Sequence, residues 1–243
     1  AAMPLTINGK IKVTWRSHRV WPGDRLALGH TKKGCRGYLA VARGFAANKF
    51  FGSTSTVLRE GLGRALRAGD ILGCDSSEDE GDLALPMTEI PSYRDEVCLR
   101  VIPGYHHNLF RDDARDVFFG SEYRVTNQCD RMGYRLEGPS VESTRLTLLS
   151  EGISLGAIQI PADGQPIVLL NDHQTIGGYP KIGFVLSCDL ARLAQCNPGA
   201  YVRFESIPAG DAQDILRNVK ARTESIQLKF ASDVVDVSQE NRE

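Results

Sequence analysis

The side chains of this chain best suited to chemistry follow one apolar run. Residues 167–170 are apolar at every position, and directly after them come Asn171, Asp172, His173, Gln174 and Thr175. A run that is apolar on both faces is typical of a strand in the middle of a sheet. The sequence therefore predicts carboxylate, imidazole and amide groups at the end of a buried strand.

A glycine loop completes this group: Gly177, Gly178, Tyr179, Pro180 and Lys181. Glycines let backbone N–H groups approach a ligand because no Cβ intervenes, and lysine offers a point charge to a carboxylate or phosphate. A pair of glycines alone is more often an ordinary turn. The crowding of Asp172, Gln174 and Lys181 around it favours a binding site.

A glutamine lies on the preceding apolar segment, residues 156–161. If this segment is a strand, its period of two places Ala157 and Gln159 on one face and Ile158 and Ile160 on the other. Taken alone, Gln159 is expected to face solvent. The alternative is an inward amide that contacts a ligand beside the small alanine.

Two arginines flank Gly133 in the segment 130–139. Arg131 and Arg135 could clamp an anion, because guanidinium groups bind carboxylate or phosphate in a bidentate manner. Surface ion pairs with Asp130 and Glu137 explain them equally well. The sequence leaves both interpretations open.

Familiar catalytic templates are absent. The chain has no Walker A, G-x-G-x-x-G, H-E-x-x-H or cysteine–histidine zinc spacing, so no metal site is predicted. His106 and His107 are expected in a solvated turn. Residues 52–56 are rich in hydroxyl groups and are predicted as a turn or helix cap first, and as a ligand contact second.

Charge and cysteine usage limit the class of protein. The 29 Lys and Arg against 30 Asp and Glu give a net charge of −1, which disfavours nucleic acid and anionic membranes as partners. Six cysteines without a C-x-x-C pair predict reduced thiols. With no signal peptide or membrane-length apolar run in the sequence, we expect a cytoplasmic protein.

Short alternating runs separated by turns predict a mainly β fold, and we favour a barrel. Asn8-Gly9 predicts a hairpin turn. Further strands are expected within residues 34–45, 96–104, 121–126, 135–139, 145–152, 156–161, 166–170, 183–187 and 201–207. The acidic run 76–82 is expected to be a loop or linker between an amino-terminal β part, residues 1–75, and a barrel part, residues 83–230.

Helical patterns are few. Helices are predicted at residues 111–121, at 189–195 with Ser187 or Asp189 as the cap, and at 212–227. The last residues, 238–243, are predicted to be disordered.

At these motifs the sequence resembles a known family. The segments DRMGYRLEGP and SEGISLGAIQIPADGQPIVLLNDHQTIGGYPKIGFV, with the earlier RGYLAVARGF, GSTSTVLR and GRALRAGDIL, are similar to the allophanate hydrolase subunit 2 family. This family includes the C subunit of bacterial 5-oxoprolinase and half of the carboxyltransferase domain of urea carboxylase. The resemblance implies a cyclophilin-like β-barrel with a few short helices, and a missing amino-terminal family segment.

The resemblance also implies a function in a complex. The expected role is that of the C subunit in an ATP-dependent 5-oxoprolinase, a hydrolase that uses ATP with magnesium. The expected partners are a B-like protein of the allophanate hydrolase subunit 1 family and an A-like protein. On this basis Lys181 and Asp172 are the candidate catalytic residues. The candidate substrate-binding residues are Arg131, Arg135, Gln159, Gln174, Thr175, Gly177, Gly178 and Tyr179.

Two other functions remain open. One is carboxyl transfer to urea or a related amide, which needs a biotin carrier on another polypeptide. The other is a non-catalytic regulator that binds the B-like partner. Both enzymatic functions, on 5-oxoproline or on urea, require a site for a small amide.

Overall fold

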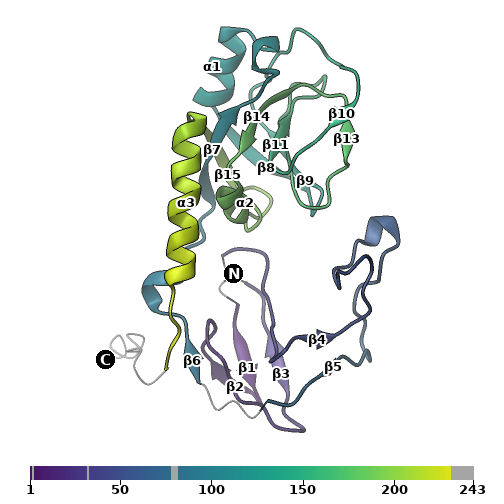
Figure 1. The fold of residues 1–243 in the computed structure, drawn as a ribbon, viewed down its shortest axis with the longest axis vertical. Helices are drawn as coiled ribbons and strands as arrows, with labels where there is room; N and C mark the ends of the chain where they lie inside the picture. Colours follow the sequence, from purple (N-terminus) through teal and green to yellow (C-terminus); the bar gives the residue numbers. More distant parts are fainter. Residues whose placement is uncertain (2, 32, 78–81, 231–243) are drawn as a thin grey trace.

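A seven-stranded closed barrel forms the upper part of the molecule in Figure 1. The computed structural model describes residues 1, 3–31, 33–77 and 82–230. In barrel order the strands are β11 (Ala157–Gln159), β12 (Ile167–Leu169), β9 (Gly133–Glu137), β8 (Glu122–Cys129), β15 (Tyr201–Ser206), β7 (Glu96–Pro103) and β14 (Lys181–Val185). Adjacent strands are antiparallel except β15 and β7, which are parallel. The predicted mainly β fold and its barrel are confirmed.

Alternate side chains along the strands fill the interior of the barrel. Along β7, Val97, Leu99 and Val101 are buried, while Glu96 and Cys98 are exposed. This period of two is the pattern of a strand with one face in the core. The run 167–170 behaves as predicted, because β12 lies between β11 and β9 and its residues are largely buried.

Three α-helices accompany the barrel. Helix α1 (Asp112–Gly120) packs against β15, where the rings of Phe118 and Phe204 stack at 4.4 Å. Helix α3 (Ala209–Ser225) buries Ala212 against Leu186 and Ile207. Both match their predicted positions, although α3, with 17 residues, is longer than the short helices expected.

Helix α2 (Ser187–Leu193) differs from its prediction. It begins earlier than expected, with Leu186 at the N-cap position and no capping bond from a side chain. Neither Ser187 nor Asp189 caps it. Asp189 instead lies inside the helix and binds Arg100 of β7. Its carboxylate therefore forms a tertiary ion pair and does not form the helix cap that the local sequence predicts.

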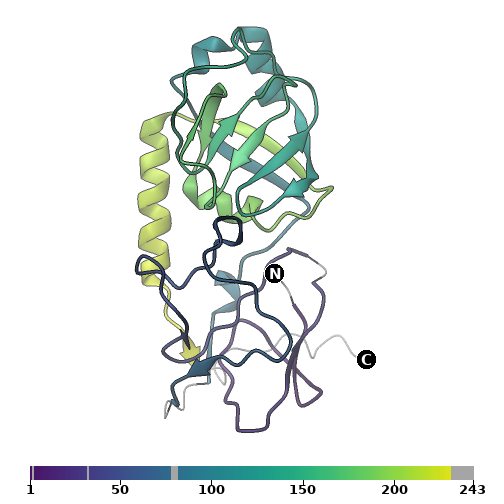
Figure 2. The same cartoon turned by 90° about the vertical axis from the view of Figure 1, so that its right-hand side faces the viewer.

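Small sheets make up the amino-terminal part, which lies below the barrel in both views (Figure 2). A three-stranded sheet joins β2 (Lys10–Lys12), β1 (Leu5–Ile7) and β3 (Leu26–Leu28). The predicted turn is confirmed: Asn8 and Gly9 both have positive φ, and Ile7 pairs with Lys10 across it. Two further pairs join β4 (Phe45–Ala46) to β5 (Gly73–Cys74), and β6 (Leu83–Ala84) to β16 (Lys229–Phe230).

Two predicted strands form only at their carboxyl ends. Residues 34–44 form no strand, and only β4 begins at Phe45. Residues 145–150 are also irregular, with the short β10 (Glu151–Gly152) following them. Both segments carry apolar side chains but pair with no neighbouring strand in the described part of the chain, and a strand needs a partner for its backbone groups.

Short elements complete the chain. They are the 3-10 helices η1 (Leu58–Glu60), η2 (Met87–Glu89) and η3 (His107–Leu109), and the strand β13 (Ile176–Gly177), which pairs with β10. Within the described residues, no helix combines the length and apolar character needed to cross a membrane. Residues 78–81 of the predicted acidic loop, and the predicted disordered tail, lie outside the described residues.

Candidate functional site

A buried lysine and a buried glutamine lie side by side on the barrel wall. Gln159 of β11 pairs with Lys181 of β14 across a β-bulge. The two residues are 2% and 1% exposed. The neighbouring Ile158 and Ile182 belong to the barrel core, so the alternation along the strands directs Gln159 and Lys181 to the opposite face.

The expectation that Gln159 faces solvent is therefore wrong. A small two-stranded sheet is responsible, because β10 and β13 bring Glu151 and Gly177 together in register beside these residues. A Cβ built on Gly177 would lie 3.2 Å from Nε2 of Gln159. Local sequence could not show that this covering sheet of β10 and β13 lies over the outer face of β11.

Glu151 of β10 joins this covering sheet to the barrel wall. Its Oε1 accepts a charge-assisted hydrogen bond from Nζ of Lys181 and another, at 2.5 Å, from the hydroxyl of Tyr105. Nε2 of His106 lies 3.6 Å from the same oxygen. The Glu151 side chain is 32% exposed, so solvent reaches this cluster from the glutamate side.

These contacts change the ionisation of the cluster. Burial alone would raise the pKa of Glu151, but the hydrogen bonds from Lys181 and Tyr105 outweigh it and lower the pKa below its usual value. Burial and the bond to Glu151 raise the pKa of Tyr105 to about 12. Burial lowers the pKa of His106, which favours the neutral imidazole at neutral pH.

Gln159 supplies a donor with nothing to bind. Its buried Nε2 has no hydrogen-bond partner among the described residues. Leaving a buried amide donor unpaired costs about 1–3 kcal/mol, so such groups require an explanation. Nε2 of Gln174 is also close, 3.6 Å from the Cβ position of Gly177. The structure thus brings together predicted residues Lys181, Gln159, Gln174 and Gly177.

The adjoining Gly178 is held by Leu148, in the segment just before β10. The carbonyl of Gly178 accepts a hydrogen bond from the backbone of Leu148 at 2.7 Å, and a Cβ on Gly178 would meet the Leu148 carbonyl at 2.6 Å. Thr175 accepts at its carbonyl from the backbone of Ile153 at 3.0 Å. Thr175 and Tyr179 are exposed.

The remaining predicted residues form separate ion pairs. Arg131 binds Asp172, with Nε 2.9 Å from Oδ2, and donates to the Thr56 carbonyl at 2.9 Å. Arg135 binds Asp163 in the turn before β12. The arginines thus pair with aspartates distant in sequence, and not with Asp130 and Glu137. Each guanidinium already has a carboxylate, which weakens the case for a shared anion clamp.

Three members of the cluster, Tyr105, His106 and Glu151, were missed from the sequence. The expectation of a solvated histidine turn is wrong, because His106 and His107 are only partly exposed. His106 accepts a 3.4 Å hydrogen bond at Nδ1 from the Lys181 backbone, which leaves Nε2 on the Glu151 side. No local spacing could connect the adjacent Tyr105 and His106 to Glu151 and Lys181, because these three segments lie far apart in the chain.

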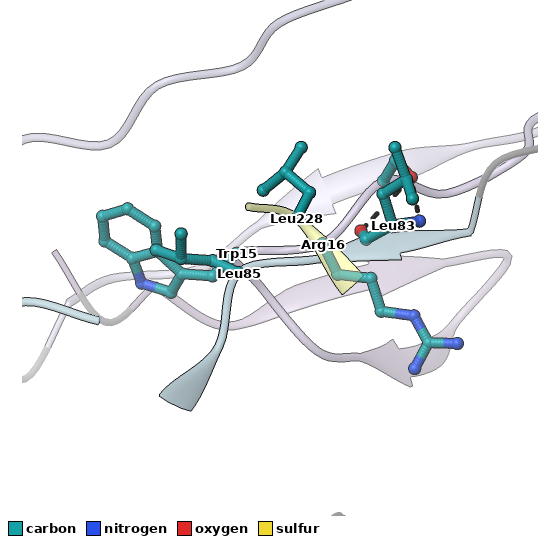
Figure 3. A pocket seen from close by; sticks show the side chains of 6 residues that line it. Trp15, Arg16, Leu83, Leu85 and Leu228 are labelled. Carbon is teal, nitrogen blue, oxygen red and sulfur yellow. Dashed lines mark hydrogen bonds between the residues drawn. The ribbon is translucent and has the colours of Figure 1, made fainter. Parts of the chain in front are cut away.

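A separate hollow lies in the amino-terminal part (Figure 3). Its volume is about 370 Å³, and Trp15, Arg16, Ser17, Leu83, Leu85 and Leu228 line it. The lining is mostly apolar and includes no predicted site residue. No group of three or more His, Cys, Asp or Glu suited to a metal ion occurs in the described ranges.

Comparison with known protein families assigns this barrel protein to a defined class. A family described as "Carboxyltransferase domain, subdomain A and B" matches residues 1–206, and the chain belongs to this family. The resemblance predicted from the sequence is confirmed.

Three relatives show where the chain lies within the family. It is 34% identical to the C subunit of 5-oxoprolinase from Haemophilus influenzae over 84% of this chain and 66% of the relative. It is 37% identical to the corresponding Escherichia coli protein, over 75% of this chain and 59% of the relative. The crystal structure of K. lactis urea amidolyase superimposes with a TM-score of 0.82 at 26% identity, covering 92% of this chain and 15% of that one. The chain thus spans about two thirds or less of each relative's length.

Proposed function

We propose that this chain is part of an ATP-dependent complex that opens the cyclic amide 5-oxoproline to glutamate. The observation that carries the proposal is the buried Lys181 beside the unpaired amide of Gln159. A lysine ammonium and an amide N–H can both donate to the oxygen of an amide carbonyl, and such donors stabilise negative charge that develops there. The two relatives named as the C subunit of 5-oxoprolinase support the choice of substrate.

ATP is assigned to the complex and not to this cluster. A triphosphate needs several cations without other partners, but Lys181 is paired with Glu151, Arg131 with Asp172, and Arg135 with Asp163. This donor set fits a neutral amide better than a nucleotide. The B-like and A-like partners would supply the ATP site and its magnesium.

Reconstitution tests the proposal. The chain alone should not turn over 5-oxoproline, and co-expression with the two partners should give 5-oxoproline-dependent ATP hydrolysis. Lys181→Met should lower that rate at least tenfold, roughly the loss of one charge-stabilising contact. Lys220→Met is the matched control, because Lys220 is an exposed residue of α3, and its rate should match wild type. A fully assembled complex without turnover would overturn the proposal.

A second candidate is carboxyl transfer to urea from a biotin carrier. The fold similarity to urea amidolyase favours it. Biotin would have to arrive on another polypeptide, so an active complex that avidin captures, and that carboxylates urea, would replace the 5-oxoproline proposal. A complex that binds the B-like partner tightly without any turnover would instead indicate a regulator.

A further inference from the structure

Glu151 has a position that its sequence neighbours do not explain. It lies on β10 of the covering sheet, and not on the barrel wall, yet it binds Lys181 of the wall and Tyr105 of the loop after β7. Lys181 is 1% exposed. A buried ammonium without a counter-ion is strongly unfavourable. Glu151 therefore permits a charged lysine under the covering sheet.

The charges in this cluster cancel. Lys181 and Glu151 are opposite in sign, and burial lowers the pKa of His106, which therefore stays neutral at neutral pH. Tyr105 keeps its proton, because its pKa is raised to about 12. A site without net charge has no electrostatic preference for an anion, and its hydrogen-bonding groups decide what binds.

Those groups match an amide. Nε2 of Gln159 and Nζ of Lys181 are donors on adjacent strands, suited to one carbonyl oxygen. The partly exposed carboxylate of Glu151 can accept from an amide N–H. An amide presents one acceptor and one donor in a plane, so it can satisfy both kinds of group.

We propose that Glu151 holds Lys181 under the two-stranded sheet of β10 and β13, so that Lys181 and Gln159 bind the carbonyl oxygen of a neutral amide while the Glu151 carboxylate accepts from its N–H. This inference rests on the proposed function for the identity of the substrate. It adds that the amide, and not a carboxylate, is the group recognised at this cluster. It also adds that this recognition depends on Glu151, a residue of the covering sheet.

Binding of a minimal amide tests the inference without turnover. The probe is 2-pyrrolidinone, a lactam without a carboxylate, titrated by calorimetry into the assembled complex. Wild type should bind it, and Glu151→Gln should weaken binding at least tenfold. Glu151→Asp should restore part of the affinity. Glu122→Gln is the matched control, because Glu122 pairs with Arg203 at the surface of β8 and β15, and it should bind as wild type does.

A spectroscopic readout separates positioning from simple loss of structure. The negative charge of Glu151 raises the pKa of His106 against the effect of burial, and Lys181 opposes it. Tyr105 also contacts Glu151 but keeps its proton. The NMR titration midpoint of His106 should therefore fall further in Glu151→Gln. Tyr105→Phe removes one hydrogen bond from Glu151 and should weaken 2-pyrrolidinone binding by a smaller factor, with the fold retained.

The outcomes distinguish the inference from the function on which it rests. Unchanged binding of 2-pyrrolidinone in a folded Glu151→Gln complex overturns the inference, even if 5-oxoproline turnover is intact. Binding that depends on Glu151, in a complex that does not hydrolyse ATP with 5-oxoproline, overturns the proposed function but supports the amide site. Tight binding of acetate that competes with 2-pyrrolidinone would show a carboxylate site and also overturn the inference.

Discussion

Arg100 of β7 and Asp189 of α2 are joined by three hydrogen bonds. The backbone N–H and Nε of Arg100 donate to Oδ2 of Asp189 at 3.0 and 2.8 Å, and its Nη2 donates to Oδ1 at 2.6 Å. Asp189 is 2% exposed. This pair fixes α2 against the barrel, and it explains why an aspartate expected at a helix cap lies inside the helix.

Asp189→Asn should destabilise the barrel by roughly 3–5 kcal/mol, because removing one charge of a buried pair leaves the other without compensation. Urea unfolding followed by circular dichroism measures the change. Asp214→Asn is the control, since Asp214 pairs with Arg217 on the exposed side of α3, and its unfolding curve should stay within about 0.5 kcal/mol of wild type. Equal curves for both variants would show that the Arg100 pair adds nothing to stability.

The same pair should make stability depend on acid pH. Burial raises the pKa of Asp189, but the hydrogen bonds from Arg100 outweigh it, so the folded pKa lies below the unfolded value. The contribution is thus fully present above the usual aspartate pKa of about 4 and is lost as pH falls through the folded pKa. The difference in unfolding free energy between wild type and Asp189→Asn should shrink as the pH is lowered from neutral through this range. A difference that stays constant would contradict this assignment.

Gly178→Ala should loosen the packing of Leu148 beside the covering sheet of β10 and β13. The added Cβ would lie 2.6 Å from the Leu148 carbonyl, which is backbone and cannot rotate away. We expect a loss of about 1–3 kcal/mol from overpacking, together with faster amide hydrogen exchange at Leu148. Gly152→Ala is the control on the paired strand, because a Cβ there meets nothing within 4 Å. Slower or unchanged exchange at Leu148 in Gly178→Ala would argue against a rigid contact.

Gln195→Ala should detach the segment 34–37 from the barrel. Oε1 of Gln195 accepts from the backbone N–H of Cys35 and Arg36 at 3.0 and 2.9 Å, and Nε2 donates to the Arg36 carbonyl at 3.0 Å. Without these bonds, the amides of Cys35 and Arg36 should exchange roughly 5- to 30-fold faster, as expected from about 1–2 kcal/mol of lost local stability. Gln213→Ala, at an exposed position of α3, should leave both rates as in wild type. Equal exchange rates in the two variants would show that Gln195 does not hold the segment.

Several features follow from local sequence alone. Asn8-Gly9 specifies its turn because both residues tolerate positive φ. The apolar spacing of α1 and α3 specifies helices, and the alternation along β7 specifies one buried face. The family motifs also follow from the sequence, since each is a contiguous segment.

The tertiary structure decided the rest. Residues 34–44 have the composition of a strand but no partner strand in the described part of the chain, so they are irregular. Gln159 alternates as an outward residue does, yet the covering sheet of β10 and β13 buries it. Glu151, Tyr105 and His106 join Lys181 only through the closure of the barrel and the packing of that two-stranded sheet across it. A hydrogen bond forms only when its two groups lie within a few ångströms of each other. For residues far apart in the chain, that closeness exists only once the strands have paired.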